Sequence, residues 1–358
     1  MTAKRFHIDK REIGGGRAFL IAEVAQAHDG SLGAAHAFID AASDVGADAI
    51  KFQTHIAAAE STLDEPFRLK FSRQDVTRYD YWRRMEFTPE QWRGLAQHAR
   101  DRKLVFLSSA FSVEAVDLLE GLGVPAWKIG SGEIVTNDLL ERMSGTGKPM
   151  LISTGMSGYE EITAVHERWS SRGNAIALFQ CTTKYPTAMP DVGLNVLARM
   201  KSAFPCPIGL SDHSGRPEPA MAAIARGADL VELHVTFDHR SFGPDTVASV
   251  TFADFARIVT FRDCLVEMDA NPVDKDALAA QMRPTREIFG KSLALKADQP
   301  AGTVLRRDML TLKKPGTGIA PDAIDKIVGC RLLTDADSRY LLRWNQIEAH
   351  ADEPGASA

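Results

Sequence analysis

The sequence predicts an α/β fold in which a (β/α)₈ barrel is followed by a small β-rich module. Two observations carry this prediction. Short apolar runs alternate eight times with stretches of helical spacing, which suits a closed barrel better than an open doubly wound sheet. Near Pro284 this pattern gives way to short strand-like runs separated by turns. An irregular α/β domain with fewer true strands is the alternative interpretation.

The expected strands are near-continuous apolar runs, as is typical of parallel strands covered by helices. In chain order they span residues 19–25, 48–55, 104–111, 126–133, 150–156, 176–183, 207–214 and 230–237. Helical spacing is clearest over residues 34–47, 88–103, 113–123 and 217–228, with a last barrel helix over about 252–268. The expected N-caps are Ser31, Thr88 and Ser112, and the expected helix ends are Gly46, Gly121 and Gly227.

Two segments do not follow the repeat. Residues 56–87 are aromatic and Arg-rich, which is typical of a lid or binding loop, with a solvated surface insertion as the alternative. The glycines of IGGGRAF (13–19) precede a strand and are expected to form a hairpin turn. The predicted division of the chain is a barrel over 1–270, a linker over 271–284, a β-rich domain over 285–350 and a disordered tail over 351–358.

Charge and composition exclude several classes of protein. The 42 Lys and Arg against 47 Asp and Glu give a net charge of −5, which argues against a nucleic-acid partner. No segment approaches the roughly 20 apolar residues that cross a bilayer, so no membrane partner and a cytoplasmic location are expected. The four cysteines are widely scattered, which indicates reduced thiols and neither a zinc knuckle nor a disulfide framework.

Polar residues gather at the carboxyl ends of the expected strands, where barrel enzymes place their active sites. If the strands close into a barrel, all of these side chains are expected to converge on one cavity. They are Glu23, Lys51, Gln53, Ser108, Ser109, Lys128, Ser131, Glu133, Ser153, Thr154, Gln180, Thr182, Thr183, Ser211, Asp212, His213, Glu232 and His234.

Two kinds of site are expected among these residues. Lys51 and Lys128 lie in strands that should be buried, and a buried ammonium without a partner is costly. With the surrounding hydroxyls, they favour a phosphate or carboxylate ligand, or else a carboxylate partner. His213 and His234 end neighbouring strands, with Glu232 on the same face as His234, so they could hold a divalent metal with open positions. A single histidine here could instead be structural.

A series of motifs resembles the sialic acid synthase family, which makes N-acetylneuraminate and related nonulosonates such as legionaminate and pseudaminate. The resemblance runs from about residue 19 to about residue 335. It implies a TIM barrel followed by an antifreeze-like (SAF) domain, in a domain-swapped homodimer whose SAF domain covers the partner's active site. The motifs are IAEVAQAHDGS (21–31), GADAIKFQTH (46–55), FLSSAF (106–111), VPAWKIGSGE (124–133), KPMLISTGM (148–156), QCTTKYPT (180–187), GLSDHS (209–214), VELHVTFD (231–238), GPD (243–245) and KKPGTG (313–318).

The resemblance also implies a reaction: phosphoenolpyruvate condenses with an open-chain N-acetylhexosamine, either N-acetylmannosamine or a 2,4-diacetamido-trideoxyhexose. The products are a nonulosonic acid and phosphate, and the cofactor is Mn²⁺ or Mg²⁺. Glu23 or Glu232 is expected to move protons. The implied phosphoenolpyruvate site is Lys51, Ser109, Lys128, Ser131, Ser153 and Ser211, the implied metal ligands are His213 and His234, and the sugar-facing residues are Gln53, Thr183, Tyr185, Asp245 and Lys314.

Some positions depart from the family pattern. Ala27 precedes His28 where Asn is common, and Leu233 replaces a basic residue between Glu232 and His234; both changes are expected to touch the cavity region. Lys314 replaces an arginine expected to reach the sugar's N-acyl group across the dimer, and lysine cannot reproduce a bidentate fork.

Three other functions remain open from the sequence. The first is a 3-deoxy-sugar-phosphate synthase, another barrel that condenses phosphoenolpyruvate. The second is a Schiff-base aldolase using Lys128, and the third is a non-catalytic sugar-binding paralogue.

Overall fold

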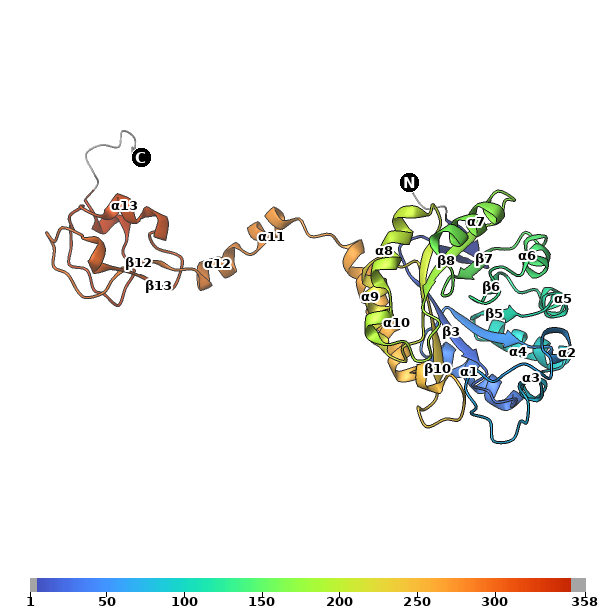
Figure 1. Cartoon of the computed structure of the whole chain (residues 1–358). Helices are drawn as coiled ribbons and strands as arrows, with labels where there is room; N and C mark the ends of the chain where they lie inside the picture. Colours follow the sequence, from blue (N-terminus) through green and yellow to red (C-terminus); the bar gives the residue numbers. More distant parts are fainter. Residues whose placement is uncertain (1–4, 349–358) are drawn as a thin grey trace. The chain divides into compact units, whose positions relative to one another are not determined.

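A computed structural model describes residues 5–348 of the chain (Figure 1). The chain forms two compact units, Met1–Ala270 and Asn271–Ala358. The disordered tail predicted over 351–358 lies outside the described residues, as do the last two positions of the predicted β-rich domain.

The first unit is a closed barrel of eight parallel strands, which confirms the predicted fold. Each barrel strand pairs with the next, and β10 pairs with both β9 and β3, so the sheet has no open edge in the barrel. The short strand β11 (Val250–Thr251) adds to β10 outside this ring. The barrel strands are β3 (Phe19–Ala25), β4 (Ala49–Thr54), β5 (Val105–Ala110), β6 (Trp127–Ile129), β7 (Met150–Ser153), β8 (Ile176–Cys181), β9 (Ile208–Asp212) and β10 (Leu230–Thr236).

Helices lie around the outside of the barrel (Figure 1). Ser31, Thr88 and Ser112 each accept a backbone N–H at a helix N-terminus, as predicted. Gly121 was the wrong helix end: α5 continues through it, and the left-handed backbone that stops the helix falls at Gly123 (φ 74°). The outer helices are α1 (Leu32–Asp44), α4 (Pro89–Asp101), α5 (Val113–Leu122), α6 (Asn137–Ser144), α7 (Tyr159–Ser170), α8 (Leu194–Ala203), α9 (Pro217–Ala225) and α10 (Phe252–Ala270).

Alternation along the strands separates an outer core from an inner one. In β3, Leu20, Ala22 and Val24 pack in the outer core, while Phe19 and Ile21 pack inside the barrel. The next inward position of β3 is Glu23, because successive side chains of a strand point to opposite faces. Other strands follow the same order: their inward side chains are apolar in the interior of the barrel and polar at the carboxyl end of the strand. The cavity therefore sits on a packed hydrophobic floor.

A hairpin closes the amino-terminal end of the barrel, but its turn does not lie where the sequence predicted it. Strands β1 (Phe6–Ile8) and β2 (Arg11–Ile13) pair antiparallel, and Ile8 and Ile13 are fully buried in the interior cluster. The turn lies between these strands, so the prediction that the glycines of residues 13–19 form it was wrong; Gly14 and Gly16 link β2 to β3 instead.

A buried ion pair ties the last barrel helix to the barrel floor. Arg262 of α10 is 1% exposed and donates to Asp48 Oδ2 at 2.6 Å, and the same oxygen accepts Leu20 N–H at 3.0 Å. We expect Arg262→Leu to lower the free energy of unfolding by about 1.5–3 kcal/mol, because Asp48 loses its buried charged partner and keeps only the partly exposed Arg17 and Arg11. Arg257→Leu removes an exposed pair with Asp254 on the same helix and should cost less than about 1 kcal/mol. Equal losses in urea unfolding would contradict this account.

Residues 56–87 contain two helices, α2 (Ala57–Glu60) and α3 (Arg78–Met85), so this segment is not a featureless surface insertion. Thr77 and Asp80 form a capping box that starts α3. Buried side chains of both helices make a small core of their own with partly buried aromatic residues of the intervening loop and of α3: Ala57, Tyr81, Trp82, Met85, Phe67, Phe71 and Tyr79.

The second unit contains two exposed helices, α11 (Lys275–Gln281) and α12 (Arg283–Phe289), and then a small β-rich fold. Strands β12 (Ser292–Leu295) and β13 (Leu310–Lys313) pair antiparallel, isolated bridges extend the pairing, and α13 (Ile324–Ile327) completes a separate apolar core.

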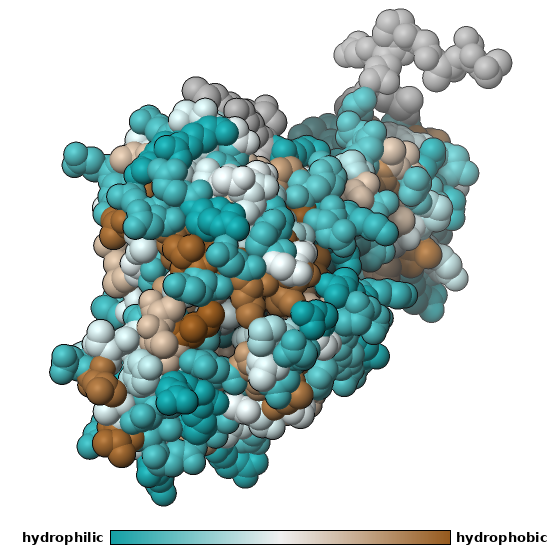
Figure 2. All heavy atoms as spheres, turned by 90° about the vertical axis from the view of Figure 1, so that its right-hand side faces the viewer, coloured by the Kyte–Doolittle hydropathy of each residue, from teal (hydrophilic) through white to brown (hydrophobic). Residues whose placement is uncertain are grey.

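Hydrophilic residues predominate on the face of the molecule in Figure 2, with hydrophobic residues between them in small groups. Within residues 5–348, the structure has no helix long and apolar enough to cross a membrane.

Candidate active site

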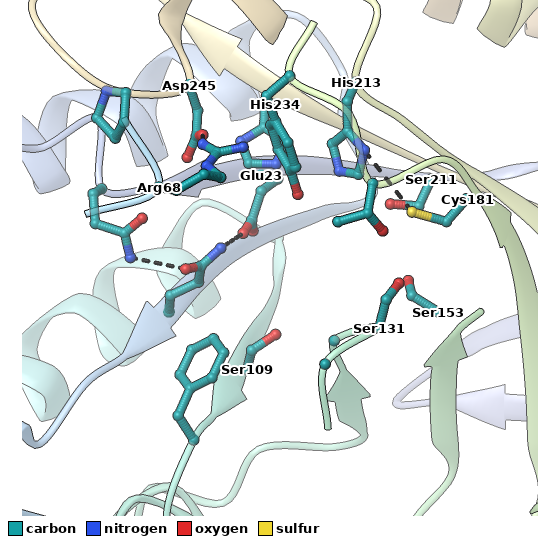
Figure 3. A pocket seen from close by; sticks show the side chains of 18 of the residues that line it. Glu23, Arg68, Ser109, Ser131, Ser153, Cys181, Ser211, His213, His234 and Asp245 are labelled. Carbon is teal, nitrogen blue, oxygen red and sulfur yellow. Dashed lines mark hydrogen bonds and ion pairs between the residues drawn. The ribbon is translucent and has the colours of Figure 1, made fainter. Parts of the chain in front are cut away.

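The carboxyl ends of the barrel strands surround one cavity of about 320 Å³. In Figure 3, Glu23, His213 and His234 lie on one side of it, with Ser109, Ser131 and Ser153 across from them. The lining includes every barrel residue that the sequence assigned to proton transfer, the metal, phosphoenolpyruvate or the sugar: Glu23, Lys51, Gln53, Ser109, Lys128, Ser131, Ser153, Thr183, Tyr185, Ser211, His213, Glu232, His234 and Asp245.

The expectation that all polar strand-end residues converge on the cavity was too broad. Ser108, Thr154, Gln180, Thr182 and Asp212 do not line it. Alternation turns them away, and their side chains satisfy local hydrogen bonds. Ser108 pairs with Thr54, the Thr154 hydroxyl donates to Phe179 O, the Gln180 amide donates to Val192 O, the Thr182 hydroxyl donates to Asp191 O, and Asp212 accepts from Ser214.

Two lysines and two glutamates form a buried charge network in the cavity. Lys51 Nζ lies 2.7 Å from Glu23 Oε1 and 3.6 Å from Glu232 Oε1. Lys128 Nζ lies 3.5 Å from the same oxygen of Glu232 and donates to Ser153 Oγ at 2.7 Å. All four side chains are 5% exposed or less. The sequence left a choice between an anionic ligand and carboxylate partners, and the network supplies the partners.

The network shifts the pKa values of its two carboxyl groups in opposite directions. Burial raises the pKa of Glu23 to about 7, with Lys51 opposing the change and Glu232 adding to it. Burial would also raise the pKa of Glu232, but Lys128 and Lys51 outweigh it and hold that pKa below its usual range. Burial lowers the pKa of Lys128, whereas Glu23 and Glu232 outweigh burial at Lys51 and raise its pKa. Glu23 can therefore exchange a proton near neutral pH while Glu232 stays ionised.

Each glutamate also keeps one oxygen without a hydrogen-bond partner. Glu23 Oε1 accepts from Lys51 and from Gln53 Nε2 at 2.8 Å, but Glu23 Oε2 is buried and unbonded. Glu232 Oε2 is in the same state. Because buried polar atoms are normally satisfied, these two oxygens indicate positions where a ligand would bond.

The serines line the same cavity beside the lysines. Gly155 N donates to Ser131 Oγ at 2.9 Å, which fixes the loop after β7 against the loop after β6. A Cβ at Gly155 would lie 2.3 Å from Thr183 Oγ1 and 2.9 Å from Cys181 Sγ. The glycine is therefore required for this close approach of three strand ends.

The two histidines are neutral and adjacent. Burial lowers the pKa of each of His213 and His234 to about 3, and their ring centroids lie 5.2 Å apart. His213 Nδ1 lies 3.0 Å from Thr182 O; a proton on Nδ1 donates to that carbonyl and leaves the lone pair of Nε2 free. No group of three His, Cys, Asp or Glu side chains within residues 5–348 is arranged to hold a metal ion. The donor set fits a metal bound by two imidazoles, with other positions open to water or substrate.

Several cavity residues were not predicted from the sequence. Most come from the 56–87 segment, whose composition signalled a lid without indicating which side chains face inward. Arg68 is the clearest case: it pairs with Asp245 at 2.7 Å, and its guanidinium lies 4.0 Å from the centre of the Tyr185 ring (Figure 3). The others include Gln26, Phe67, Phe71, Arg78, Tyr81, Trp82, Phe111 and Cys181.

The expectation that Ala27 and Leu233 touch the cavity was wrong. Leu233 is 1% exposed and packs in the outer core, because it alternates with the inward residues Glu232 and His234. Ala27 packs against the same outer core. Lys314 belongs to the second unit, where its ammonium lies 5.2 Å from the centre of the Phe289 ring, and its expected role toward the sugar stays a prediction.

His28, next to Ala27, is also buried outside the cavity lining, with its ring 4.8 Å from that of Phe87. Burial, with smaller contributions from His55 and Arg84, lowers its pKa from 6.5 to about 3. Below pH 6.5, His28 binds a proton in the unfolded chain but not in the folded chain. The free energy of unfolding therefore decreases by about 1.4 kcal/mol for each unit by which the pH is lowered, down to about pH 3.

We expect His28→Phe to lack this contribution to the pH dependence of the free energy of unfolding, measured by urea unfolding between pH 6.5 and 5. An unchanged slope would contradict it.

The geometry defines the class of protein as a (β/α)₈-barrel enzyme whose active site lies at the carboxyl ends of the strands. Within this class, the chain belongs to the NeuB family, whose family model matches residues 38–268, and a SAF domain model matches residues 290–347. These matches confirm the resemblance found in the sequence.

Relatives match nearly the full chain. The chain is 32% identical over 344 residues to N,N'-diacetyllegionaminic acid synthase of Legionella pneumophila, covering 92% of this chain and 95% of that protein. It is 33% identical over 338 residues to human N-acetylneuraminate-9-phosphate synthase, covering 93% of each. Among solved structures, the N-acetylneuraminic acid synthetase of Leptospira borgpetersenii, in complex with citrate, superposes with a TM-score of 0.68 at 26% identity, covering 79% of this chain and 97% of that chain. Such relatives are synthases of nonulosonic acids.

Proposed function

We propose that this protein condenses phosphoenolpyruvate with an open-chain N-acetylhexosamine to give a nonulosonic acid and phosphate. The observation that carries the proposal is the buried network of Lys51, Lys128, Glu23 and Glu232 beside the paired histidines. The names of the relatives support a sialic-type product.

Phosphoenolpyruvate would occupy the half of the cavity that contains the lysines. Its phosphate and carboxylate require cationic and hydroxyl donors, and Lys51 and Lys128 supply the charge. The hydroxyls come from serines at the ends of β5, β6, β7 and β9, which are Ser109, Ser131, Ser153 and Ser211.

A divalent ion, Mn²⁺ or Mg²⁺, would be held by His213 and His234 and would supply Lewis acidity toward the acceptor aldehyde. The neutral imidazoles support this assignment, because metal ligation uses the ring lone pair.

Protons would move through the glutamates. As carbon 3 of the enol phosphate bonds to the aldehyde carbon, the aldehyde oxygen gains a proton and becomes a hydroxyl. Water then adds at carbon 2 and loses one proton, and its other proton passes to the departing phosphate as the carbon–oxygen bond to phosphate breaks to leave a ketone. Glu23, with its unbonded Oε2 and a pKa of about 7, is suited to give the first proton and take up the second.

The acceptor would lie toward the lid. Gln53, Thr183, Tyr185 and Asp245 line that part of the cavity and supply hydrogen-bonding groups for sugar hydroxyls. We also propose a domain-swapped homodimer in which Lys314 reaches the partner's cavity, and a cytoplasmic location. The mass of the protein in solution tests the dimer.

The proposed function is tested by phosphate release from phosphoenolpyruvate, with Mn²⁺ or with EDTA. The acceptor panel holds N-acetylmannosamine, its 6-phosphate and 2,4-diacetamido-trideoxyhexoses. Release with one of these sugars, abolished by EDTA, is the expected result. Release only with a simple aldose phosphate would favour the 3-deoxy-sugar-phosphate synthase. Covalent inactivation by borohydride with substrate would instead favour a Schiff base on Lys128.

A further inference from the structure

A buried histidine that the proposed reaction does not use, His55, lies behind the cavity wall. Its ring is stacked between Trp82, with ring centroids 3.9 Å apart, and Phe111, at 4.5 Å, and the residue is 5% exposed. Trp82 and Phe111 line the cavity, whereas His55 does not. The two stacked rings cover both faces of the imidazole and fix its plane. Its two nitrogens can therefore form hydrogen bonds only at the ring edge.

Both ring nitrogens of His55 have close polar neighbours. Nδ1 lies 2.5 Å from Glu60 Oε1, and Nε2 lies 2.7 Å from Gln26 Nε2. The Gln26 amide nitrogen also donates to Gln53 Oε1 at 2.8 Å, and Gln53 Nε2 donates to Glu23 Oε1 at 2.8 Å. These contacts form one continuous chain from Glu60 to Glu23.

With Glu23 Oε1 as an acceptor, one arrangement of protons satisfies the four short contacts of this chain, and it leaves the longer contact between His55 Nε2 and Gln53 Oε1, at 3.4 Å, without a hydrogen. Glu23 Oε1 accepts, so Gln53 must present its nitrogen to Glu23 and its oxygen to Gln26. Gln26 then presents its nitrogen, a donor, to His55 Nε2, which must accept. The His55 proton is left on Nδ1, where the Glu60 carboxylate accepts it.

We propose that His55 is a positioning residue: as an Nδ1–H tautomer it fixes Gln26 and Gln53, and through them it holds Glu23 with Oε1 bonded and Oε2 free. This role rests on the proposed function, because it matters to catalysis only if Glu23 moves protons.

The lid supplies two of the groups that hold His55. Glu60 is the last residue of α2, and Trp82 lies in α3. Glu60 Oε2 also accepts Ile56 N–H at 3.2 Å, which ties the carboxylate to the start of α2. Folding of the 56–87 segment is therefore what fixes the tautomer of His55 and, with it, the orientation of Glu23.

Nitrogen-15 NMR of the histidine side chains tests the tautomer without any substrate. The His55 signals are identified by their loss in His55→Phe, which keeps a ring between Trp82 and Phe111 but has no nitrogens. The expected result at neutral pH is a protonated Nδ1 and an unprotonated Nε2. An Nε2–H tautomer in the wild-type protein would overturn the proposal.

Kinetics test the consequence. We expect His55→Phe to lower kcat by about 10- to 100-fold, because Glu23 is less well placed, with KM for phosphoenolpyruvate within about twofold. Gln26→Leu should lower kcat similarly. The kcat of the double variant should be no lower than that of the less active single variant, because both substitutions break the same hydrogen-bond chain. His36→Phe, which changes a histidine paired with His98 between α1 and α4, is the matched control and should keep its kcat. Wild-type kcat in His55→Phe, or additive losses in the double variant, would overturn the proposal.

The proposal and the proposed function fail in different ways. If the wild-type protein releases no phosphate with any acceptor, the proposed function fails. The side-chain amide signals of Gln26 and Gln53 still test the chain in that case: they should shift in His55→Phe and stay in place in His36→Phe. Unshifted signals in His55→Phe would overturn the role of His55 by themselves.

Discussion

Replacing Glu23 with glutamine is expected to lower kcat by about 10²- to 10⁴-fold, the usual contribution of a general acid–base group. Glutamine keeps the size of the side chain and an oxygen for Lys51, but it cannot give or take a proton. Lys51 also retains Glu232 at 3.6 Å, so phosphoenolpyruvate should still bind. Steady-state phosphate release with the identified acceptor should show the loss in kcat, with little change in KM for phosphoenolpyruvate.

The control for this variant is Glu120→Gln, which alters a glutamate–lysine pair with Lys148 outside the cavity. It should leave kcat unchanged. A Glu23→Gln enzyme within tenfold of the wild type, together with an inactive Glu232→Gln enzyme, would move the proton transfer to Glu232 and contradict the assignment.

Lys51→Met is expected to damage both binding and stability. The substitution leaves Glu23 and Glu232 side by side without their shared ammonium, and only Lys128, at 3.5 Å from Glu232, remains. Breaking a buried ion pair in this way should lower the free energy of unfolding by about 3–5 kcal/mol. Affinity for phosphoenolpyruvate should fall about 10- to 100-fold, since one charge-assisted hydrogen bond is lost. Urea unfolding and calorimetric titration measure the two effects.

Lys148→Met provides the comparison, because it removes the lysine of the partly exposed Glu120 pair. It should cost less than about 1 kcal/mol and should not change the affinity for phosphoenolpyruvate. If Lys51→Met binds phosphoenolpyruvate as tightly as the wild-type protein, the lysine network is structural and the donor site lies elsewhere.

The barrel could be predicted from the sequence because each strand is an apolar run that ends in polar residues. The same pattern placed Glu23, Lys51, Lys128, His213 and His234 in one cavity. Treating every polar strand-end residue as a site residue was the error: applying the two-residue period of a strand would have removed Asp212 and placed Leu233 in the outer core.

The lid residues could not be predicted in the same way. The segment from 56 to 87 has no sustained period, and its inward side chains are selected by packing over long distances in the chain. Arg68 and Asp245, which pair at the cavity mouth, are 177 positions apart. The role of His55 depends likewise on three-dimensional neighbours, Glu60, Gln26 and two aromatic rings, that no local pattern brings together.

In the proposed reaction, this cavity joins the vinyl carbon of phosphoenolpyruvate to an N-acetylhexosamine aldehyde. The most direct measurement is carbon NMR of phosphoenolpyruvate carrying a carbon isotope label at that vinyl position, mixed with the protein, Mn²⁺ and each acceptor. We expect the vinyl signal to be replaced by the methylene signal of a nonulosonic acid, and only when an acceptor is present. A methyl signal from pyruvate, or an unchanged vinyl signal with every acceptor, would contradict it.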